Sequence, residues 1–269
     1  MSDLFCPSDA ARHLVLPRED DDKYARGVVG FITGSARYPG AAVLGVEAAL
    51  RTGVGMVRYL GPGRATRLVL QRRPEAVTTE GRVQAWVLGS GWDTAVDDFT
   101  TMLLGPALAA EVPIVLDAGA LGRWGEVTGP AVLTPHAGEL ARLLGAERDE
   151  VLADREAAVR RAARETGSTV LLKGAETLVA DPAGRLERVR NATPWLATAG
   201  AGDALAGILG ALLATNHERP DDRVGVAATA AWIHGEAARR ASDGGPFTIL
   251  DLCAAVPRVV ADLVATMKP

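Results

Sequence analysis

A run of small residues leads into a carboxylate near the end of the chain, in Thr198-Ala-Gly-Ala-Gly-Asp203. An apolar helix is predicted directly after it, so its backbone N–H groups and the helix N-terminus can bind a phosphate. The expected anion-binding residues are Ala199, Gly200, Ala201 and Gly202. Asp203 stands beside that site, where a carboxylate can take a proton from a hydroxyl nucleophile. The alternative interpretation is an ordinary helix N-cap, in which Asp and Gly are common.

A second small-residue loop follows a predicted strand at residues 173–177. A lysine and a threonine on either side of a glycine can contact the phosphate and ribose oxygens of a nucleotide. The expected nucleotide contacts are Lys173, Gly174, Ala175, Glu176 and Thr177, together with Gly202. The alternative is a turn with a solvated lysine. Neither G-x-x-x-x-G-K-[ST] nor a well-placed G-x-G-x-x-G is found, so a bound nucleotide would be held by these two loops.

Polar side chains also follow two other predicted strands. His136 comes after Thr134-Pro135, and Glu139 stands in the first turn of the next predicted helix. An exposed histidine there can donate to a polar substrate or a phosphate, or the pair can form a helix cap without a ligand. Asp117 ends a further strand, where it either orients a metal-bound water near the phosphates or caps the following turn. Asp117 is therefore a candidate for the metal site.

Two loops rich in glycine offer room for a flat ring. Gly34-Ser-Ala-Arg-Tyr-Pro-Gly-Ala41 follows the first predicted strand, and Gly89-Ser-Gly91 follows the third. Tyr38 can stack on a ring, and the bare backbone near Ala41 and Gly91 lets a ring lie close. The alternative is that both segments only turn the chain, with Pro39 starting a helix.

Alternating elements place all these loops at one edge of a sheet. Strands are predicted at 27–33, 54–60, 85–89, 113–117, 131–134 and 169–173, with a hairpin at 177–181 and 186–190. Helices are predicted at 41–52, 95–110, 139–144, 150–166, 203–214, 222–241 and 250–267. This order favours an α/β fold with a mostly parallel sheet between two helical layers. Ligands of such sheets bind at the carboxyl ends of the strands, where each candidate loop begins. We expect one domain over residues 24–269, preceded by a poorly ordered or surface-lying arm at 1–23.

Composition excludes several classes of protein. The net charge of −4 and the pI of about 5.7 argue against a nucleic-acid partner. Cys6 and Cys253 are far apart, which argues against a disulfide framework or a cysteine metal site. The charged first 26 residues do not resemble a secretory signal, and no apolar run is long enough to span a membrane. The cytoplasm is the expected compartment.

The ordered motifs resemble one known family. The series G-S-x-x-Y-P-G-A-A, G-x-G, L-D-A-x-A-L, T-P-H-x-G-E, K-G-x-x-T and T-x-G-x-G-D-x-L-A-G, over about residues 24–240, is similar to the ADP/ATP-dependent (S)-NAD(P)H-hydrate dehydratases. These enzymes belong to the ribokinase-like superfamily, so the resemblance implies a ribokinase-like three-layer sandwich. It also implies repair of hydrated NADH or NADPH: ADP or ATP with Mg²⁺ phosphorylates the ring hydroxyl, and phosphate then leaves.

The resemblance carries over to individual positions of this chain. Ala41, Gly91, His136 and Asp203 match positions that contact the hydrate. Lys173 to Thr177 and Gly202 match positions that contact the adenine nucleotide. A homo-oligomer, often a tetramer, is implied as well. Many family members carry an N-terminal epimerase domain that this chain is too short to hold, so a separate epimerase is an expected partner.

The chain departs from the family pattern at three places. Gly119 replaces the usual Asp of L-D-A-D-A-L, Ser90 stands where G-P-G is more usual, and Ala199-Gly-Ala-Gly202 replaces a loop of the G-G-S-G type. None of these changes removes the proposed base. Two other functions remain open on the sequence: a vitamin-precursor kinase of the same superfamily, and a catalytically silent nucleotide sensor. The preference between ADP and ATP is open too.

Overall fold

The alternation of strands and helices produces an eight-stranded sheet. The computed structural model describes residues 4–92, 96–219 and 221–267. The strands are β1 (Val28–Ile32), β2 (Met56–Tyr59), β3 (Ala85–Leu88), β4 (Ile114–Leu116), β5 (Ala131–Leu133), β6 (Thr169–Leu172), β7 (Thr177–Ala180) and β8 (Leu186–Val189). Their order in the sheet is β2-β1-β3-β4-β5-β6-β7-β8. All pairs up to β6 are parallel, whereas β7 and β8 are antiparallel. The predicted parallel sheet with a terminal hairpin is therefore confirmed.

Helices cover both faces of this sheet. They are α1 (Pro7–Ala11), α2 (Gly40–Thr52), α3 (Gly63–Arg72), α4 (Asp98–Leu108), α5 (Ala137–Leu144), α6 (Arg148–Ala153), α7 (Arg155–Thr166), α8 (Ala201–Thr215), α9 (Arg223–Ser242) and α10 (Ile249–Thr266), with short 3₁₀ helices η1 (Ala118–Glu126) and η2 (Pro194–Leu196). Among the helices of the described residues, none is long and apolar enough to cross a membrane.

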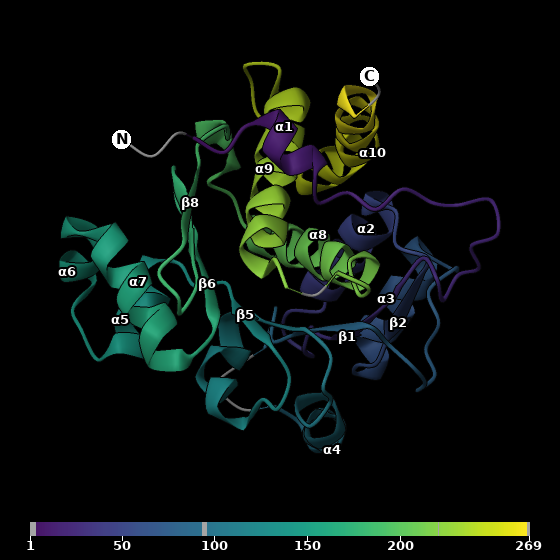
Figure 1. Ribbon diagram of the computed structural model, residues 1–269. Coiled ribbons are helices and arrows are strands. Elements are labelled where there is room, and N and C mark those ends of the chain that lie inside the picture. Colours follow the sequence, from purple (N-terminus) through teal and green to yellow (C-terminus); the bar gives the residue numbers. More distant parts are fainter. Residues whose placement is uncertain (1–3, 93–95, 220, 268–269) are drawn as a thin grey trace.

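Alternate residues of the central strands point into two separate cores. Val29, Val87 and Val115 belong to the core with α2, α8 and α9, whereas Trp86 and Leu88 belong to the core with α4, α5 and α7. Figure 1 shows α8, α9 and α10 together, and α5, α6 and α7 grouped near β6. The three-layer α/β sandwich expected from the sequence is confirmed.

The first residues of the chain are not a surface-lying arm throughout. Phe5, Ala10, Ala11 and Leu14 are buried, and α1 packs against α9 and α10. The Phe5 N–H also donates to the carbonyl of Arg188 at 2.8 Å. The expectation is wrong for residues 5–14, because apolar residues in a five-residue helix give too short a pattern to identify a buried face. Residues 15–20 do lie exposed on the surface.

Two predicted helices have different bounds in the structure. The charged segment 150–166 forms α6 and α7 rather than one helix, because Asp154 leaves the helical conformation and its side chain accepts the N–H of Ala157 at 2.9 Å. The segment predicted at 95–110 is helical as α4, and residue 95 lies outside the described residues. No helix was predicted at α3, because its apolar stripe is short.

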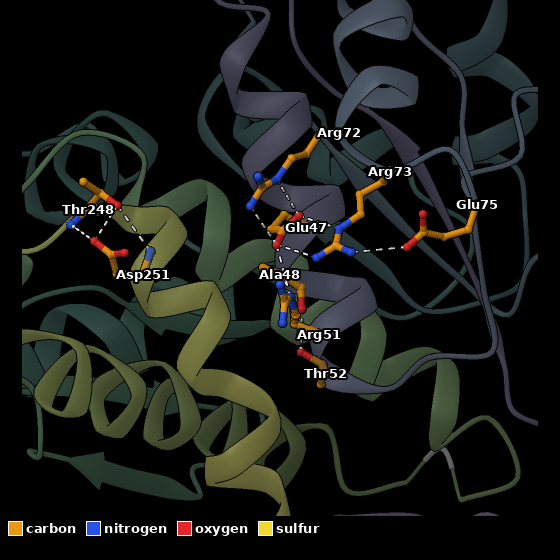
Figure 2. Close-up of polar contacts among 9 residues, drawn as sticks. All are labelled: Glu47, Ala48, Arg51, Thr52, Arg72, Arg73, Glu75, Thr248 and Asp251. Carbon is orange, nitrogen blue, oxygen red and sulfur yellow. Dashed lines mark hydrogen bonds and ion pairs between the residues drawn. The ribbon is translucent and has the colours of Figure 1, made fainter.

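A buried carboxylate holds α2 against α3 (Figure 2). Glu47 is fully buried and accepts hydrogen bonds from Arg51, Arg72 and Arg73. Burial raises the pKa of Glu47, but the bonds from Arg73 and Arg72 outweigh it, so the net pKa is lowered. The charged carboxylate therefore fixes the position of α2, the helix that begins beside the candidate site.

Candidate active site

Hydrogen bonds join the strand-end loops at one edge of the sheet. The Gly34 N–H, after β1, donates to the Ser90 carbonyl, after β3, at 2.7 Å. The Ser90 hydroxyl donates to Asp117 Oδ2, after β4, at 2.8 Å. Asp117 Oδ1 accepts from Thr134, after β5, at 2.8 Å and from the Lys173 ammonium, after β6, at 2.9 Å. The loops therefore converge, as a parallel sheet requires.

The buried Asp117 forms an ion pair with the partly exposed Lys173 at the centre of this edge. Asp117 is only 2% exposed, and both of its oxygens accept hydrogen bonds. Burial lowers the pKa of Lys173, but the charges of Asp117 and Glu139 outweigh it, and the net pKa is raised. The Glu139 carboxylate lies 3.8 Å from the ammonium. Lys173 is therefore a fixed cation, pointing toward the start of α8.

Asp203 lies in the first turn of α8, opposite this ion pair. Burial and, after it, the charge of Asp117 raise its pKa, and Lys173 opposes both, so that the net pKa is about 7. The helix begins after Gly200, whose φ of 92° is left-handed. A Cβ at Gly200 would also lie 2.5 Å from Leu44 Cδ1. The turn preceding Asp203 therefore requires glycine at position 200. The Asp203 carboxyl group, with its raised pKa, can gain or lose a proton near neutral pH.

Close helix packing brings α2 to the same place. A Cβ at Gly207 of α8 would lie 2.2 Å from the carbonyl oxygen of Gly45 of α2, so the two backbones touch. Ala41 stands at the start of α2, and a Cβ at Gly91 would lie 2.4 Å from the Ala41 Cβ. Bare backbone thus brings together Ala41 and Gly91, two of the predicted substrate contacts.

A cavity of about 470 Å³ opens between the two predicted nucleotide loops. Its lining includes Lys173, Gly174, Ala175 and Thr177 from one loop and Ala201 and Gly202 from the start of α8. A Cβ at Gly202 would lie 3.5 Å from Lys173 Nζ, so the two loops approach each other at the ammonium. The volume is within the range of small-molecule sites.

Several predicted contacts lie beside the cavity rather than on its wall. Its lining, as far as the structure describes it, does not include Glu176, Ala199, Gly200 or Asp203. The Glu176 carboxylate is turned toward Arg188, 3.4 Å away. Ala41, Gly91 and His136 lie outside the lining as well. The cavity therefore includes only some of the predicted contacts, and Asp203 follows directly on Gly202, one of its lining residues.

His136 has the geometry of a helix cap. Its Nδ1 accepts the N–H groups of Gly138 and Glu139 at 3.1 and 3.2 Å, and Glu139 accepts the His136 N–H at 2.8 Å. The imidazole is 57% exposed, and its Nε2 lies 3.6 Å from Glu139. His136 therefore caps α5, and its exposed ring lies beside Glu139, the carboxylate near the Lys173 ammonium.

Sequence reasoning missed two side chains of the cavity. His234 lies on α9, most of whose residues are buried. It is buried, and its pKa is lowered to about 4, chiefly by that burial, but it also lines the cavity. Its Nε2 has no hydrogen-bond partner among the described residues. Asn191, also on the wall, donates to the Trp232 carbonyl at 2.8 Å. Their position depends on how β8 meets α9, which no local pattern encodes.

Two of the departures from the family pattern have a structural explanation. A Cβ at Gly119 would lie 2.8 Å from the Trp92 Cβ, so the usual aspartate cannot fit unless Trp92 moves. Ser90 supplies a hydroxyl that proline cannot, and this hydroxyl donates to Asp117. The changes at this edge are therefore matched to the neighbouring residues of this chain.

Comparison with known proteins gives a consistent result. Residues 29–254 match the model of the NAD(P)H-hydrate dehydratase family. The bifunctional NAD(P)H-hydrate repair enzyme Nnr of Mycobacterium tuberculosis is 44% identical over 223 residues, which cover 78% of this chain and 46% of that protein. The chain thus spans about half the length of several curated relatives that it matches.

Other relatives match over most of their own length. The ADP-dependent (S)-NAD(P)H-hydrate dehydratase of Neisseria meningitidis serogroup B is 37% identical over 238 residues, covering 82% of this chain and 79% of that protein. The crystal structure of the ADP/ATP-dependent dehydratase of Bacillus subtilis, co-crystallised with ATP and Mg²⁺, superposes with a TM-score of 0.86. The two are 25% identical, and the alignment covers 97% of this chain and 98% of that one. The chain therefore belongs to the NAD(P)H-hydrate dehydratase family.

Proposed function

We propose that this protein dehydrates the S epimer of NAD(P)H hydrate with ADP or ATP as co-substrate, which makes it a hydro-lyase that restores NADH or NADPH. The observation that carries the proposal is Asp203, a carboxyl group with a pKa of about 7 directly beside the cavity between the two nucleotide loops. A general base works best when its pKa is near the working pH. Family membership supports the choice of substrate.

In this proposal Asp203 takes the proton of the ring hydroxyl as the hydroxyl oxygen attacks the terminal phosphoryl group. The nucleotide leaves with one phosphate fewer. The N–H groups of Ala199 and Gly200, just before α8, and of Ala201 and Gly202, in its first turn, stabilise the phosphoryl oxygens, since the first N–H groups of a helix have no partners within it. The Ala201 N–H would share its long 3.4 Å hydrogen bond to the Thr198 carbonyl. Phosphate then departs with the electrons of the C–O bond. Loss of a proton from the neighbouring carbon restores the double bond.

The two substrates occupy different parts of the site in this proposal. The cavity lined by Lys173, Gly174, Ala175 and Thr177 takes the nucleotide, with Glu176 shaping the turn. Ala41, Gly91 and His136 contact the hydrate at the carboxyl ends of β1, β3 and β5. The close packing of Gly91 against Ala41 supports this assignment, because it holds the loops after β1 and β3 together at the edge where the hydrate would bind.

Magnesium enters with the nucleotide in this proposal. The described residues contain no group of three or more His, Cys, Asp or Glu side chains able to hold a metal ion. Mg²⁺ commonly binds through nucleotide phosphates, water and one or two carboxylates, and it neutralises the phosphate charge. Asp117 already accepts three hydrogen bonds, so we assign it to holding Lys173 rather than to the metal.

The experiment that tests the function is incubation of the protein with hydrated NADH, Mg²⁺ and either ADP or ATP. Return of the absorbance of reduced nicotinamide, with one phosphate released for each ring restored, is the expected result. Accumulation of a stable phosphorylated product would instead support the vitamin-precursor kinase. No reaction with either nucleotide, despite measurable nucleotide binding, would support the silent sensor. Comparing the two nucleotides gives the preference that the sequence leaves open.

The raised pKa of Asp203 gives a pH dependence of turnover. The base acts only when deprotonated, so kcat should rise about tenfold per pH unit below the pKa and level off above about pH 7. A pH profile measured at saturating nucleotide and hydrate checks this. A rate that stays constant from pH 5 to pH 8 contradicts the assignment.

The remaining parts of the proposal concern the whole protein. We propose that residues 24–269 act as one catalytic domain in the cytoplasm and assemble as a homotetramer. The family resemblance supports the tetramer. Relatives of about twice the length are named bifunctional, which supports an epimerase acting alongside this dehydratase domain. Neither nucleic acid nor a membrane has a role in this proposal.

A further inference from the structure

A guanidinium group lies under the nucleotide loop without lining the cavity. Arg155, the first residue of α7, directs its Nη2 at three backbone carbonyls around the turn at 173–176. The oxygen of Glu176 is 2.9 Å away, that of Lys173 3.3 Å and that of Leu172 3.5 Å. One cation thus bridges both ends of the turn, because its donors replace the water that would otherwise solvate these carbonyls.

The glycine in this turn is matched to the guanidinium. A Cβ at Gly174 would lie 2.5 Å from Nη2 and 2.6 Å from Nη1 of Arg155. Any side chain at position 174 that kept the present backbone would therefore displace Arg155. Contact with Arg155 therefore explains part of the requirement for glycine at position 174, independently of any ligand in the cavity.

The side chain of Glu176 is held on the same side of the turn. Its carboxylate lies 3.4 Å from Arg188, and Arg188 also pairs with Glu156, the residue after Arg155. The Glu176 backbone and side chain are thus both bound to groups outside the cavity. This leaves Lys173, Gly174, Ala175 and Thr177 as the residues of the loop that line it.

We propose that Arg155 is a positioning residue that holds the Lys173–Thr177 loop in its nucleotide-binding shape. It contacts neither the cavity nor Asp203 and acts only through the backbone of the loop. The inference rests on the proposed function in taking an adenine nucleotide as the ligand. Arg155 affects the affinity for the nucleotide and leaves the rate of the chemical step unchanged.

The test measures ADP binding directly, by calorimetric titration, so that its result does not depend on turnover. Arg155→Met should weaken ADP binding about 10- to 100-fold, because hydrogen bonds from a charged donor to three carbonyls are lost. Arg155→Lys should fall between this variant and the wild type, since one ammonium cannot reproduce the planar guanidinium. In turnover assays KM for the nucleotide should rise, with KM for the hydrate and kcat at saturation unchanged.

Arg161→Met is the matched control. Arg161 stands on the same helix but pairs with Glu165 and the Leu144 carbonyl, away from the loop. The Arg161→Met variant should bind ADP with an affinity within about twofold of that of the wild type. If Arg155→Met lowers the melting temperature but binds ADP as the wild type does, Arg155 has only a structural role and the proposal fails. If Arg155→Met weakens ADP binding but the wild-type protein has no dehydratase activity, the role of Arg155 is supported and only the proposed function is rejected.

A second variant pair tests the match between position 174 and Arg155. Gly174→Ala should weaken ADP binding in the wild type, where the new Cβ collides with the guanidinium. The same change should cost little more in Arg155→Met, where the collision is gone. Equal losses of affinity in both backgrounds would mean that the methyl group blocks the ligand itself. That result would overturn the inference.

Discussion

Asp203→Asn should lower kcat by about 10²- to 10⁴-fold, the usual contribution of a general base. Asparagine has nearly the same shape, but its amide cannot take the proton of the ring hydroxyl. The first turn of α8 and the cavity beside it stay intact, so the affinity for ADP should change little. Steady-state kinetics together with ADP titration check both parts. A kcat within threefold of the wild type would remove Asp203 from the mechanism.

The same variant should change how stability depends on pH. The pKa of Asp203 is about 7 in the folded protein against an ordinary value of 3.8. A group with a raised folded pKa stabilises the protein below the unfolded pKa, and this contribution is lost as the pH rises through the folded pKa. Wild-type stability should therefore fall between about pH 4 and pH 7 through this group. That part of the fall should be absent in Asp203→Asn.

A matched control stands at the start of another helix. Asp251 lies in the first turn of α10, where it accepts the Thr248 N–H at 2.8 Å in a capping box (Figure 2). Asp251→Asn should lower stability slightly, because the capping box is weakened, and should leave kcat unchanged. If both variants lost activity equally, a general effect of helix-terminal carboxylates would explain the result. The role of Asp203 as base would then have no support.

Local sequence patterns predicted the strands and the sheet edge where their carboxyl ends meet. Apolar runs ending in Gly, Asp or Pro located the strands, and parallel pairing alone brings their carboxyl ends to one edge. The convergence of Gly34, Ser90, Asp117 and Lys173 follows from that rule and is confirmed. Family resemblance then supplied roles that no spacing rule could give.

Contacts between distant segments could not be predicted in this way. Parallel pairing of β3 and β4 brings the loops of Ser90 and Asp117 together, but the hydrogen bond between their side chains depends on how these side chains are oriented. Arg155 looked like one of many arginines on a charged helix, and only folding brings it under the turn at 173–176. The close contact between Trp92 and Gly119 likewise depends on how the segments after β3 and β4 pack against each other. Local patterns thus predict the sheet edge where the candidate residues converge, whereas the contacts that hold these residues in place depend on the fold.

Lys173→Met should impair both stability and nucleotide binding. It removes the cation that pairs with Asp117, a carboxylate that is 2% exposed, and within the part of the chain that the structure describes leaves Asp117 the hydroxyls of Ser90 and Thr134 as side-chain donors. Breaking a buried ion pair from one side typically costs about 3 to 5 kcal/mol of unfolding free energy. The ammonium also lies beside Gly202 at the cavity, so losing it should weaken ADP binding by about 10-fold or more. Chemical denaturation and ADP titration measure the two effects.

The double variant Lys173→Met/Asp117→Asn separates these effects. Asparagine at position 117 no longer buries a charge, and its amide can donate to one hydroxyl while its oxygen accepts from the other. Most of the lost unfolding free energy should therefore return. ADP affinity should stay low, because no cation faces the phosphates. Lys23→Met, which changes a lysine next to the exposed Tyr24, serves as the control with unchanged binding.

The outcome of the double variant decides what Lys173 does. If ADP affinity returned together with stability, Lys173 would act only by neutralising Asp117, and its assignment to the nucleotide would be wrong. The pH profile adds a separate check. Burial is the largest cause of the raised pKa of Asp203, while Asp117 and Lys173 act in opposite directions. Removing both charges should therefore leave the pKa of Asp203 raised, and any residual activity should still increase toward pH 7.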